Sequence, residues 1–519
     1  MKIKSIPVFL FTATLASVIF YNCGGGNSTK NETATEATPF QQTSLPQDVL
    51  QSCVVDNATL ASWFVDGQIT ENGQVKAANS VLFNPQNNCS FYTWSEQMFL
   101  WLTSKDGSVT VFESPDFYTV SPVTNNARHL IPHKKGDVLR ATSNLAKLDT
   151  EEGQATDNVL LDRYGNVVYF ITMVNDVYAA MVQMAAQYPD SITQFPTTQQ
   201  QLDSILYYAK NNNIPISNPN VLAMELKTSW VKLNGSMKEK DYITIDAIIP
   251  EYDKKSESLW VLKGETKAKL ALVGMHIVGS ANGHPEMIWS TFEHRSNTPN
   301  GSYQYINTKG DTVTVPADNS GQWLFNQNAQ NTNIADANIS FAQFNQDTIS
   351  ADTNKGNQII QPSNTIRVLP WGCAYDVQPN QEDASPAAAN SEVIAINNSI
   401  INNLKGNDVR KNYIFIGSTW TFGGAVPNGN VYNPTVAGST APGAAIGTSS
   451  LANSTMETDF QLTPTPNIKG VSASNTCFTC HNGTLDPKLY PTQADGFIGL
   501  SHVFGQLMLG VPQNKQPKK

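Results

Sequence analysis

The residues best suited to chemistry in this sequence are Cys477, Cys480 and His481, which stand together in SNTCFTCHNGT. With 6 cysteines and 7 histidines in 519 residues, the pattern C-x-x-C-H is expected by chance only about 0.001 times. In a c-type haem site, two such thiols form thioethers with the haem vinyl groups and the adjacent histidine ligates the iron. The motif therefore predicts one covalent haem c, attached at Cys477 and Cys480, with His481 as the proximal iron ligand.

Two other uses of a C-x-x-C pair fit this sequence less well. A structural zinc site needs two further ligands at similar spacing, and there is no second C-x-x-C to provide them. A thioredoxin-like redox pair belongs near the start of a βαβ unit, whereas this pair stands close to the end of a long chain. We therefore prefer the haem interpretation.

The distal side of the iron has three candidate ligands. Only 38 residues follow His481, too few to wrap a haem, so residues 461–519 are expected to dock on the upstream body, which would form most of the pocket. His502, in GLSHVF, is the first choice because a small turn would present it between apolar anchors; the alternative is a histidine at the surface or behind the ligand. Met508 is a weaker candidate and more typical of a core residue. Met456, upstream, could also reach the iron.

The N-terminus has the pattern of an export signal, as a haem attached outside the cytoplasm requires. Two lysines precede an apolar run over residues 8–21, which is short for a membrane span and matches the h-region of a signal peptide. Cys23 follows and resembles the lipid-accepting cysteine of bacterial lipoproteins, although the three residues before it depart from the usual small ones. We predict a lipoprotein signal peptide over 1–22 and lipidation of Cys23; an ordinary signal peptide, cleaved or retained, is the alternative.

Residues 23–47 are small and polar without apolar periodicity, and predict a flexible tether. The net charge of −10 argues against nucleic acid or anionic lipid as a partner. No later segment is apolar enough to cross a membrane, so the lipid would be the only anchor. We expect a protein of the cell envelope, lipid-anchored and facing the periplasm or the cell surface, with a redox protein as partner.

The body, residues 48–460, shows no internal linker and predicts a β-rich α+β fold carrying the short haem-binding segment 461–519. Asn-, Gln- and Ala-rich segments at 297–360 and 376–395 have weak patterns and predict long loops. The sequence predicts helices over 91–104, 175–187 and 198–212, strands over 221–233, 241–250, 258–264, 268–280, 286–295 and 412–422, and a hairpin turning at 164–166.

Three cysteines remain outside the motif and the lipid site: Cys53, Cys89 and Cys373. In an oxidising compartment two of them should pair. Pairing of Cys53 with Cys89 would close the N-terminal segment and is our first choice, which leaves Cys373 as a buried thiol.

A histidine-rich stretch, VGMHIVGSANGHPEMIWSTFEHR, contains His276, His284 and His294 together with Trp289 and Glu293. If it forms a hairpin that turns at the Asn-Gly pair, the three histidines fall at different places along the strands and cannot converge on one metal. We expect hydrogen-bonded histidines in a sheet. The alternative puts one of them, with Trp289 or Glu293, beside the haem as a ligand, an electron relay or an acid/base group.

Four pieces, LALVGMHIVG, HPEMIWSTFEH, LANSTMETDFQ and CFTCHN…GLSHVF, resemble a group of exported bacterial proteins of about 500 residues that end in a single C-x-x-C-H and are described only as c-type cytochromes. The resemblance implies a covalently bound haem and gives no information about a substrate.

Three functions agree with these observations. The first is electron transfer by a lipid-anchored monohaem cytochrome, which requires two strong axial ligands. The second is a peroxidase- or oxygenase-like haem enzyme with an open distal site. It is supported by the large body and by Glu293 and His294 as acid/base candidates. The third is a haem-based sensor or binding protein.

Overall fold

The structure is a computed structural model that describes residues 40–134, 138–141, 158–327, 329, 342–345, 347–351, 353, 356, 358–371, 386–432, 440–448, 451–457, 477–482 and 496–512. The predicted signal peptide, Cys23 and Cys373 lie outside these residues. Residues 40–47, predicted as part of the tether, pack on the body: Thr43 is fully buried and its backbone N–H donates to the Arg295 carbonyl at 2.8 Å.

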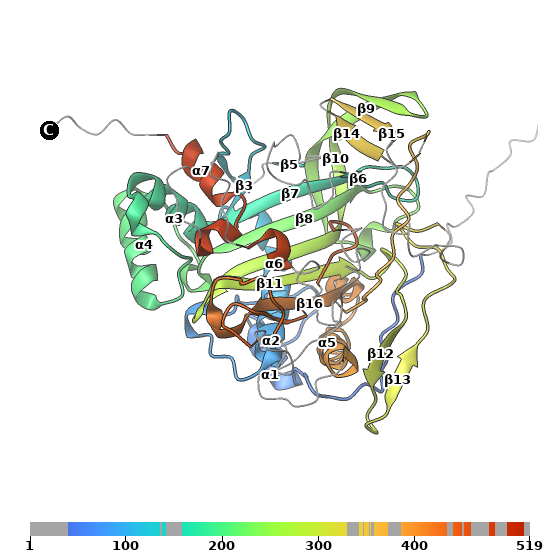
Figure 1. Ribbon diagram of the computed structural model, residues 1–519, viewed down its shortest axis with the longest axis horizontal. Helices are drawn as coiled ribbons and strands as arrows, with labels where there is room; N and C mark the ends of the chain where they lie inside the picture. Colours follow the sequence, from blue (N-terminus) through green and yellow to red (C-terminus); the bar gives the residue numbers. More distant parts are fainter. Residues whose placement is uncertain are drawn as a thin grey trace, which may run out of the picture. The chain divides into compact units, whose positions relative to one another are not determined.

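A 13-stranded sheet dominates the described chain (Figure 1), which confirms the β-rich α+β prediction. Its central strands pair antiparallel throughout. In sheet order they are β17 (Ala445–Gly447), β16 (Tyr413–Thr421), β11 (His284–His294), β10 (Leu259–Ala281), β8 (Met224–Lys232), β7 (Val168–Asn175), β3 (Phe117–Val120) and β4 (Leu130–Pro132).

Further strands extend this sheet around the outer half of β10. β9 (Thr244–Ser256) pairs along the first half of β10, and β15 pairs with its beginning. The remaining strands are β5 (Leu139–Arg140), β6 (Asn158–Val159), β14 (Ala342–Asn345) and β15 (Thr348–Ala351) in this sheet, and the separate pairs β1 (Lys105–Asp106) with β2 (Val109–Thr110) and β12 (Tyr303–Ile306) with β13 (Thr312–Val315).

Side chains alternate along these strands and build two faces. One face carries Ile171, Leu226 and Met275 into a large apolar core, which α2 and α5 cover. The other face carries two smaller apolar clusters, and α3, α4 and the C-terminal residues cover one of them. The helices are α1 (Asn57–Trp63), α2 (Asn88–Leu102), α3 (Asp176–Gln187), α4 (Gln199–Asn211), α5 (Pro386–Ile401), α6 (Cys477–Cys480) and α7 (Phe504–Gly510).

The predicted hairpins and most strands are confirmed. β10 turns into β11 at Asn282 and Gly283, where Gly283 takes the positive φ of +79° that a tight turn needs. The two strands predicted at 258–264 and 268–280 are in fact one, β10, because a bulge at Gly264 lets pairing with β9 continue across the gap.

The prediction of a loop over 376–395 is wrong for its last ten residues, which form the first part of α5. This helix is buried nearly all round, so it lacks the apolar stripe that identifies a surface helix. Its Asn397 is satisfied by the body: the side chain donates to the Phe415 carbonyl at 2.7 Å and accepts from the Phe415 N–H at 2.8 Å. The buried Asn397 amide takes the place of a neighbouring strand by bonding both backbone groups of Phe415 in β16. For this reason a segment with many polar residues can form a helix of the core.

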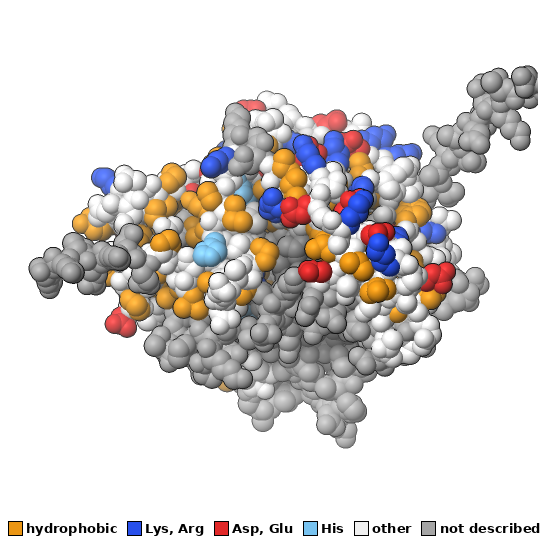
Figure 2. All heavy atoms as spheres, turned by 90° about the horizontal axis from the view of Figure 1, so that it is seen from above, with side chains coloured by type: hydrophobic (Ala, Val, Ile, Leu, Met, Phe, Trp, Pro, Cys, Tyr) orange, Lys and Arg blue, Asp and Glu red, His pale blue; other side chains and the backbone are white. Residues whose placement is uncertain are grey.

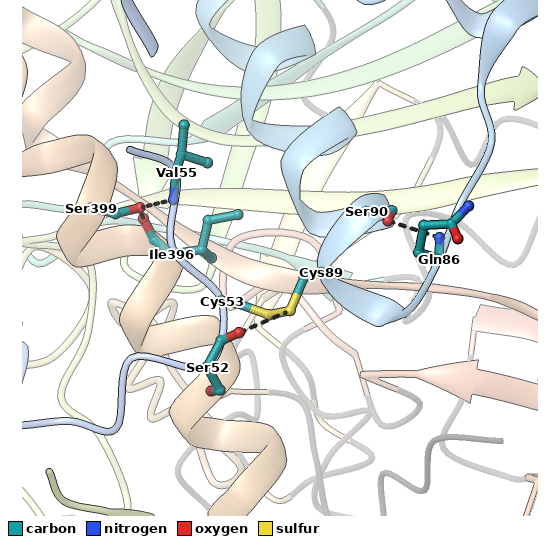
Figure 3. Close-up of a disulfide and its surroundings, with 8 residues drawn as sticks. All are labelled: Ser52, Cys53, Val55, Gln86, Cys89, Ser90, Ile396 and Ser399. Carbon is teal, nitrogen blue, oxygen red and sulfur yellow. Dashed lines mark hydrogen bonds between the residues drawn. A yellow bond between two sulfur atoms is a disulfide. The ribbon is translucent and has the colours of Figure 1, made fainter. Parts of the chain in front are cut away.

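The predicted disulfide is confirmed. Cys53, before α1, pairs with Cys89 in the first turn of α2, with the Cα atoms 5.4 Å apart (Figure 3). The bond therefore closes the N-terminal segment against the helix that covers the large core.

The outer half of the β9–β10 hairpin carries exposed ion pairs such as Lys267–Asp246 and Lys263–Glu251. In Figure 2, basic and acidic side chains of this view intermingle and are not separated by sign. Exposed pairs of this kind contribute little to stability, on the order of 0–1 kcal/mol each.

Candidate functional site

The C-terminal residues dock on the second face of the sheet. η13 (Phe497–Leu500) and α7 share an apolar cluster with α3, in which Phe504 packs edge-on against Tyr178. Polar contacts fix the same interface: Tyr178 donates to the Ser501 hydroxyl at 2.6 Å, and Ser501 donates to the Glu225 carboxylate at 2.6 Å. The body thus supports these residues, as the short chain after His481 predicts.

α6 places the C-x-x-C-H motif against strand β11. Phe478 is buried and meets the Trp289 ring edge-on at 5.8 Å, and Cys477 is half-buried beside both apolar clusters. The His481 N–H donates to the Cys477 carbonyl at 2.9 Å, which holds the histidine directly after the turn. Cys480 closes the helix; its side chain lies outside the described residues.

The His481 ring is held by three contacts. Its Nδ1 lies 2.7 Å from the Leu500 carbonyl oxygen, and its ring centroid lies 4.4 Å from Trp289 and 4.1 Å from His502. A carbonyl only accepts, so Nδ1 carries the proton and Nε2 keeps the lone pair that a metal needs. Burial, and then the charge of His502, lower the pKa of His481, so the ring stays neutral.

This donor set fits a c-type haem. A neutral imidazole with its Nδ1 proton held by a carbonyl is the state in which histidine binds iron through Nε2. Cys477, at the start of α6, stands one turn before His481, and Trp289 and Phe478 provide apolar surface beside it. Cys477, Cys480 and His481 would hold the group, which supplies a one-electron iron couple.

Of the distal candidates, the structure brings His502 to His481. Met508 lies in α7, where it packs at the edge of the cluster formed with α3. Met456 is buried in the other small cluster, with Phe170 and Val231, and not in the one that contains Phe478. The two histidine rings are stacked face to face, so an iron between them would require the rings to separate.

The three histidines of the β10–β11 hairpin have separate partners, as predicted. His276 Nε2 lies 2.9 Å from Glu457, His284 Nδ1 lies 2.8 Å from Glu286, and His294 Nδ1 lies 2.8 Å from Ser296. Burial lowers the pKa of His294 to about 3. They do not form a common metal site.

Glu293 is engaged by residues outside the motif. It is fully buried, accepts from Arg367 Nε at 3.0 Å, and accepts from the Ser454 N–H at 2.7 Å. The ion pair ties β11 to Arg367, and the hydrogen bond from Ser454 ties it to the segment 453–457. The suggestion of Glu293 as an acid/base group beside the haem therefore loses its support, whereas Trp289 does lie beside His481.

Sequence reasoning missed Lys227, Glu225 and Leu500. Lys227 lies directly across from His276 in the β8–β10 register, a relation that needs the pairing of two strands far apart in the chain. Leu500 contributes only its carbonyl, which leaves no signal in a side chain.

Searches for a matching protein family, a similar curated protein or a similar solved structure find none. In the part of the chain that the structure describes, no helix combines the length and apolar character that crossing a membrane requires. The function must therefore be argued from the site itself.

Proposed function

We propose that this protein is an exported monohaem c-type cytochrome, anchored by a lipid on Cys23, that transfers electrons in the cell envelope. Its haem would be attached at Cys477 and Cys480 and ligated by His481. The large body would serve as the wall of the haem pocket, since the chain after His481 is too short to enclose the group.

The observation that carries this proposal is the setting of His481. Its Nδ1 is engaged by the Leu500 carbonyl at 2.7 Å, its ring is buried against Trp289, and a second imidazole, His502, touches it. Backbone and aromatic contacts of this kind orient an imidazole for ligation through Nε2.

Electron transfer is favoured over turnover of a substrate for two reasons. A second histidine at the ring supports two protein ligands to the iron, which leaves no open coordination position. The acid/base candidates Glu293 and His294 are also engaged elsewhere, in an ion pair and in hydrogen bonds to Ser296 and the Asp241 carbonyl.

The test is the absorption spectrum of the protein produced with haem-maturation machinery, ferric and then reduced, with and without carbon monoxide. We expect covalent haem that survives denaturing electrophoresis, a low-spin spectrum and no response to carbon monoxide. Cys477→Ala and Cys480→Ala should lose thioether bonds, whereas the double variant Cys53→Ser/Cys89→Ser should keep them.

Other outcomes are equally informative. A high-spin spectrum or ready carbon monoxide binding would indicate an open distal side and favour the enzyme or sensor. Absence of covalent haem would overturn the proposal. Cys23→Ser should move the protein from the membrane fraction to the soluble fraction if the lipid is its anchor.

A further inference from the structure

A hollow of about 550 Å³ lies beside the helical pair α3 and α4, which pack against each other at one end of the sheet (Figure 1). Three tyrosines line it: Tyr188 directly after α3, and Tyr207 and Tyr208 in α4. The other side of α4 buries Leu202 and Ile205 in the apolar cluster shared with α3. This helix therefore turns its apolar side to the body and its aromatic and polar side to the hollow.

The tyrosine rings of the hollow are open to solvent. Tyr207 is 72 % exposed and Tyr188 is 52 % exposed. The ring centroids of Tyr188 and Tyr208 lie 6.4 Å apart with their planes at 87°, so these two rings form a corner. Single exposed apolar side chains are common on protein surfaces, but aromatic rings gathered around one hollow indicate a binding site. Tyrosine suits such sites because it offers a large, rigid and amphipathic surface at low entropic cost.

The polar side chains of the hollow select against a charged ligand. Gln200, Ser204 and Asn211 contribute neutral groups, and the lining, all of it within the described residues, contains no lysine, arginine or histidine. Its one acidic group, Asp203, already accepts from Gln199 Nε2 at 2.8 Å. An anionic ligand would find no cation in this lining, so the hollow suits a neutral ligand.

The same side chains ask for a ligand that both donates and accepts hydrogen bonds. Amides and hydroxyls do both, whereas the Asp203 carboxylate only accepts. A sugar ring matches this set, because its hydroxyls donate and accept while the C–H groups on its faces stack on aromatic rings. A proline-rich segment also stacks on tyrosines. However, proline has no backbone N–H, so such a segment would give Asp203 and the amide oxygens no donor.

We propose that the hollow between α3 and α4 binds a neutral oligosaccharide. Tyr207 and the corner formed by Tyr188 and Tyr208 stack on its rings, and Gln200 and Asn211 form hydrogen bonds with its hydroxyls. The volume of about 550 Å³ lies within the range of small-ligand sites, about 300–1,000 Å³. This inference is independent of the haem and of the proposed function, and it gives the large body a task that electron transfer alone does not require.

The experiment titrates the full-length protein with cellotetraose, maltotetraose, chitotetraose and decaproline, by isothermal titration calorimetry and saturation-transfer NMR. We expect at least one of the three sugars to bind and decaproline not to bind. Tyr207→Ala and Tyr188→Ala should each weaken sugar binding by on the order of tenfold, because each removes a stacking surface. Tyr207→Trp keeps an aromatic ring and should keep the affinity. Tyr164→Ala, at an exposed tyrosine beside Phe40, is the control and should bind like the unaltered protein.

Three results would overturn the inference. The first is that none of the three sugars binds. The second is that a sugar binds equally well to both alanine variants, which would place it elsewhere on the protein. The third is that decaproline binds and the sugars do not, which would make the hollow a site for a proline-rich protein segment. Circular dichroism checks that each variant is folded, and Tyr207→Gln replaces Tyr207→Ala with the same expectation if that variant is not.

Discussion

The His481 and His502 rings lie nearly parallel, with their centroids 4.1 Å apart and 16° between their planes. They belong to segments 19 to 21 residues apart that meet on the sheet, where the Leu500 carbonyl two residues before His502 holds His481 Nδ1. One short segment therefore both orients the proposed proximal ligand and carries the proposed distal one.

Removal of His502 should leave the distal coordination position of the haem iron vacant. In holo-protein with His502→Gly we expect a high-spin ferric spectrum, and we expect added imidazole to restore the low-spin form by occupying the vacated position. Met508→Leu, in α7, is the matched control and should remain low-spin. A low-spin His502→Gly protein without imidazole would show that another residue is the distal ligand.

The sequence allowed the hairpins and the motif to be predicted because both depend on local signals. The Asn-Gly turn and the alternation around it locate β10 and β11, and the spacing of Cys477, Cys480 and His481 defines one chemistry. Helix α5 was missed because its buried polar side chains form hydrogen bonds with backbone groups far away in the sequence, such as those of Phe415. Such partners become visible only in three dimensions.

The docking of the C-terminal residues was predictable from chain length, but its surface was not. It depends on Arg128, a fully buried residue whose partner Gln506 stands far away in sequence. The position of Lys227 across from His276 likewise depends on the pairing of β8 with β10, which no local pattern specifies.

The clamp between Arg128 and Gln506 should hold α7 in place. Arg128 Nε donates to Gln506 Oε1 at 2.6 Å, and the Arg128 N–H donates to the Gln506 carbonyl at 3.0 Å. Gln506→Ala removes a hydrogen bond to a buried charge, and we expect a loss of about 2 kcal/mol in the free energy of unfolding.

Urea unfolding measures this loss, and limited proteolysis should show earlier cleavage in the C-terminal residues. Gln199→Ala, on the exposed start of α4, is the control and should change neither. Unchanged stability and cleavage in Gln506→Ala would mean that the apolar packing of Phe504 and Leu507 alone docks the helix.

The Glu293–Arg367 pair should be structural. Glu293→Gln leaves the Arg367 guanidinium buried without its counter-charge, and loss of one partner of a buried pair costs about 3–5 kcal/mol. We expect a lower midpoint in urea together with an unchanged haem spectrum and reduction potential. A variant that is fully stable but spectrally altered would return Glu293 to the haem site.

Glu96 should make stability fall as the pH rises. It is buried in α2, and burial raises its pKa from 4.5 to about 8. Between these two values the folded protein binds a proton that the unfolded chain does not, so the free energy of unfolding decreases with pH across this window. At pH 7 the accumulated loss is on the order of 3 kcal/mol. Glu96→Gln should remove this slope.

The measurement is urea unfolding of the Glu96→Gln and unaltered proteins at pH 5, 6, 7 and 8. We expect the variant to gain stability relative to the unaltered protein as the pH rises, with the smallest difference at pH 5. Glu257→Gln, at an exposed position between β9 and β10, should leave the slope intact. Parallel curves for Glu96→Gln and the unaltered protein would mean that the buried carboxyl ionises at its ordinary pKa, with water or a polar group reaching it inside the core.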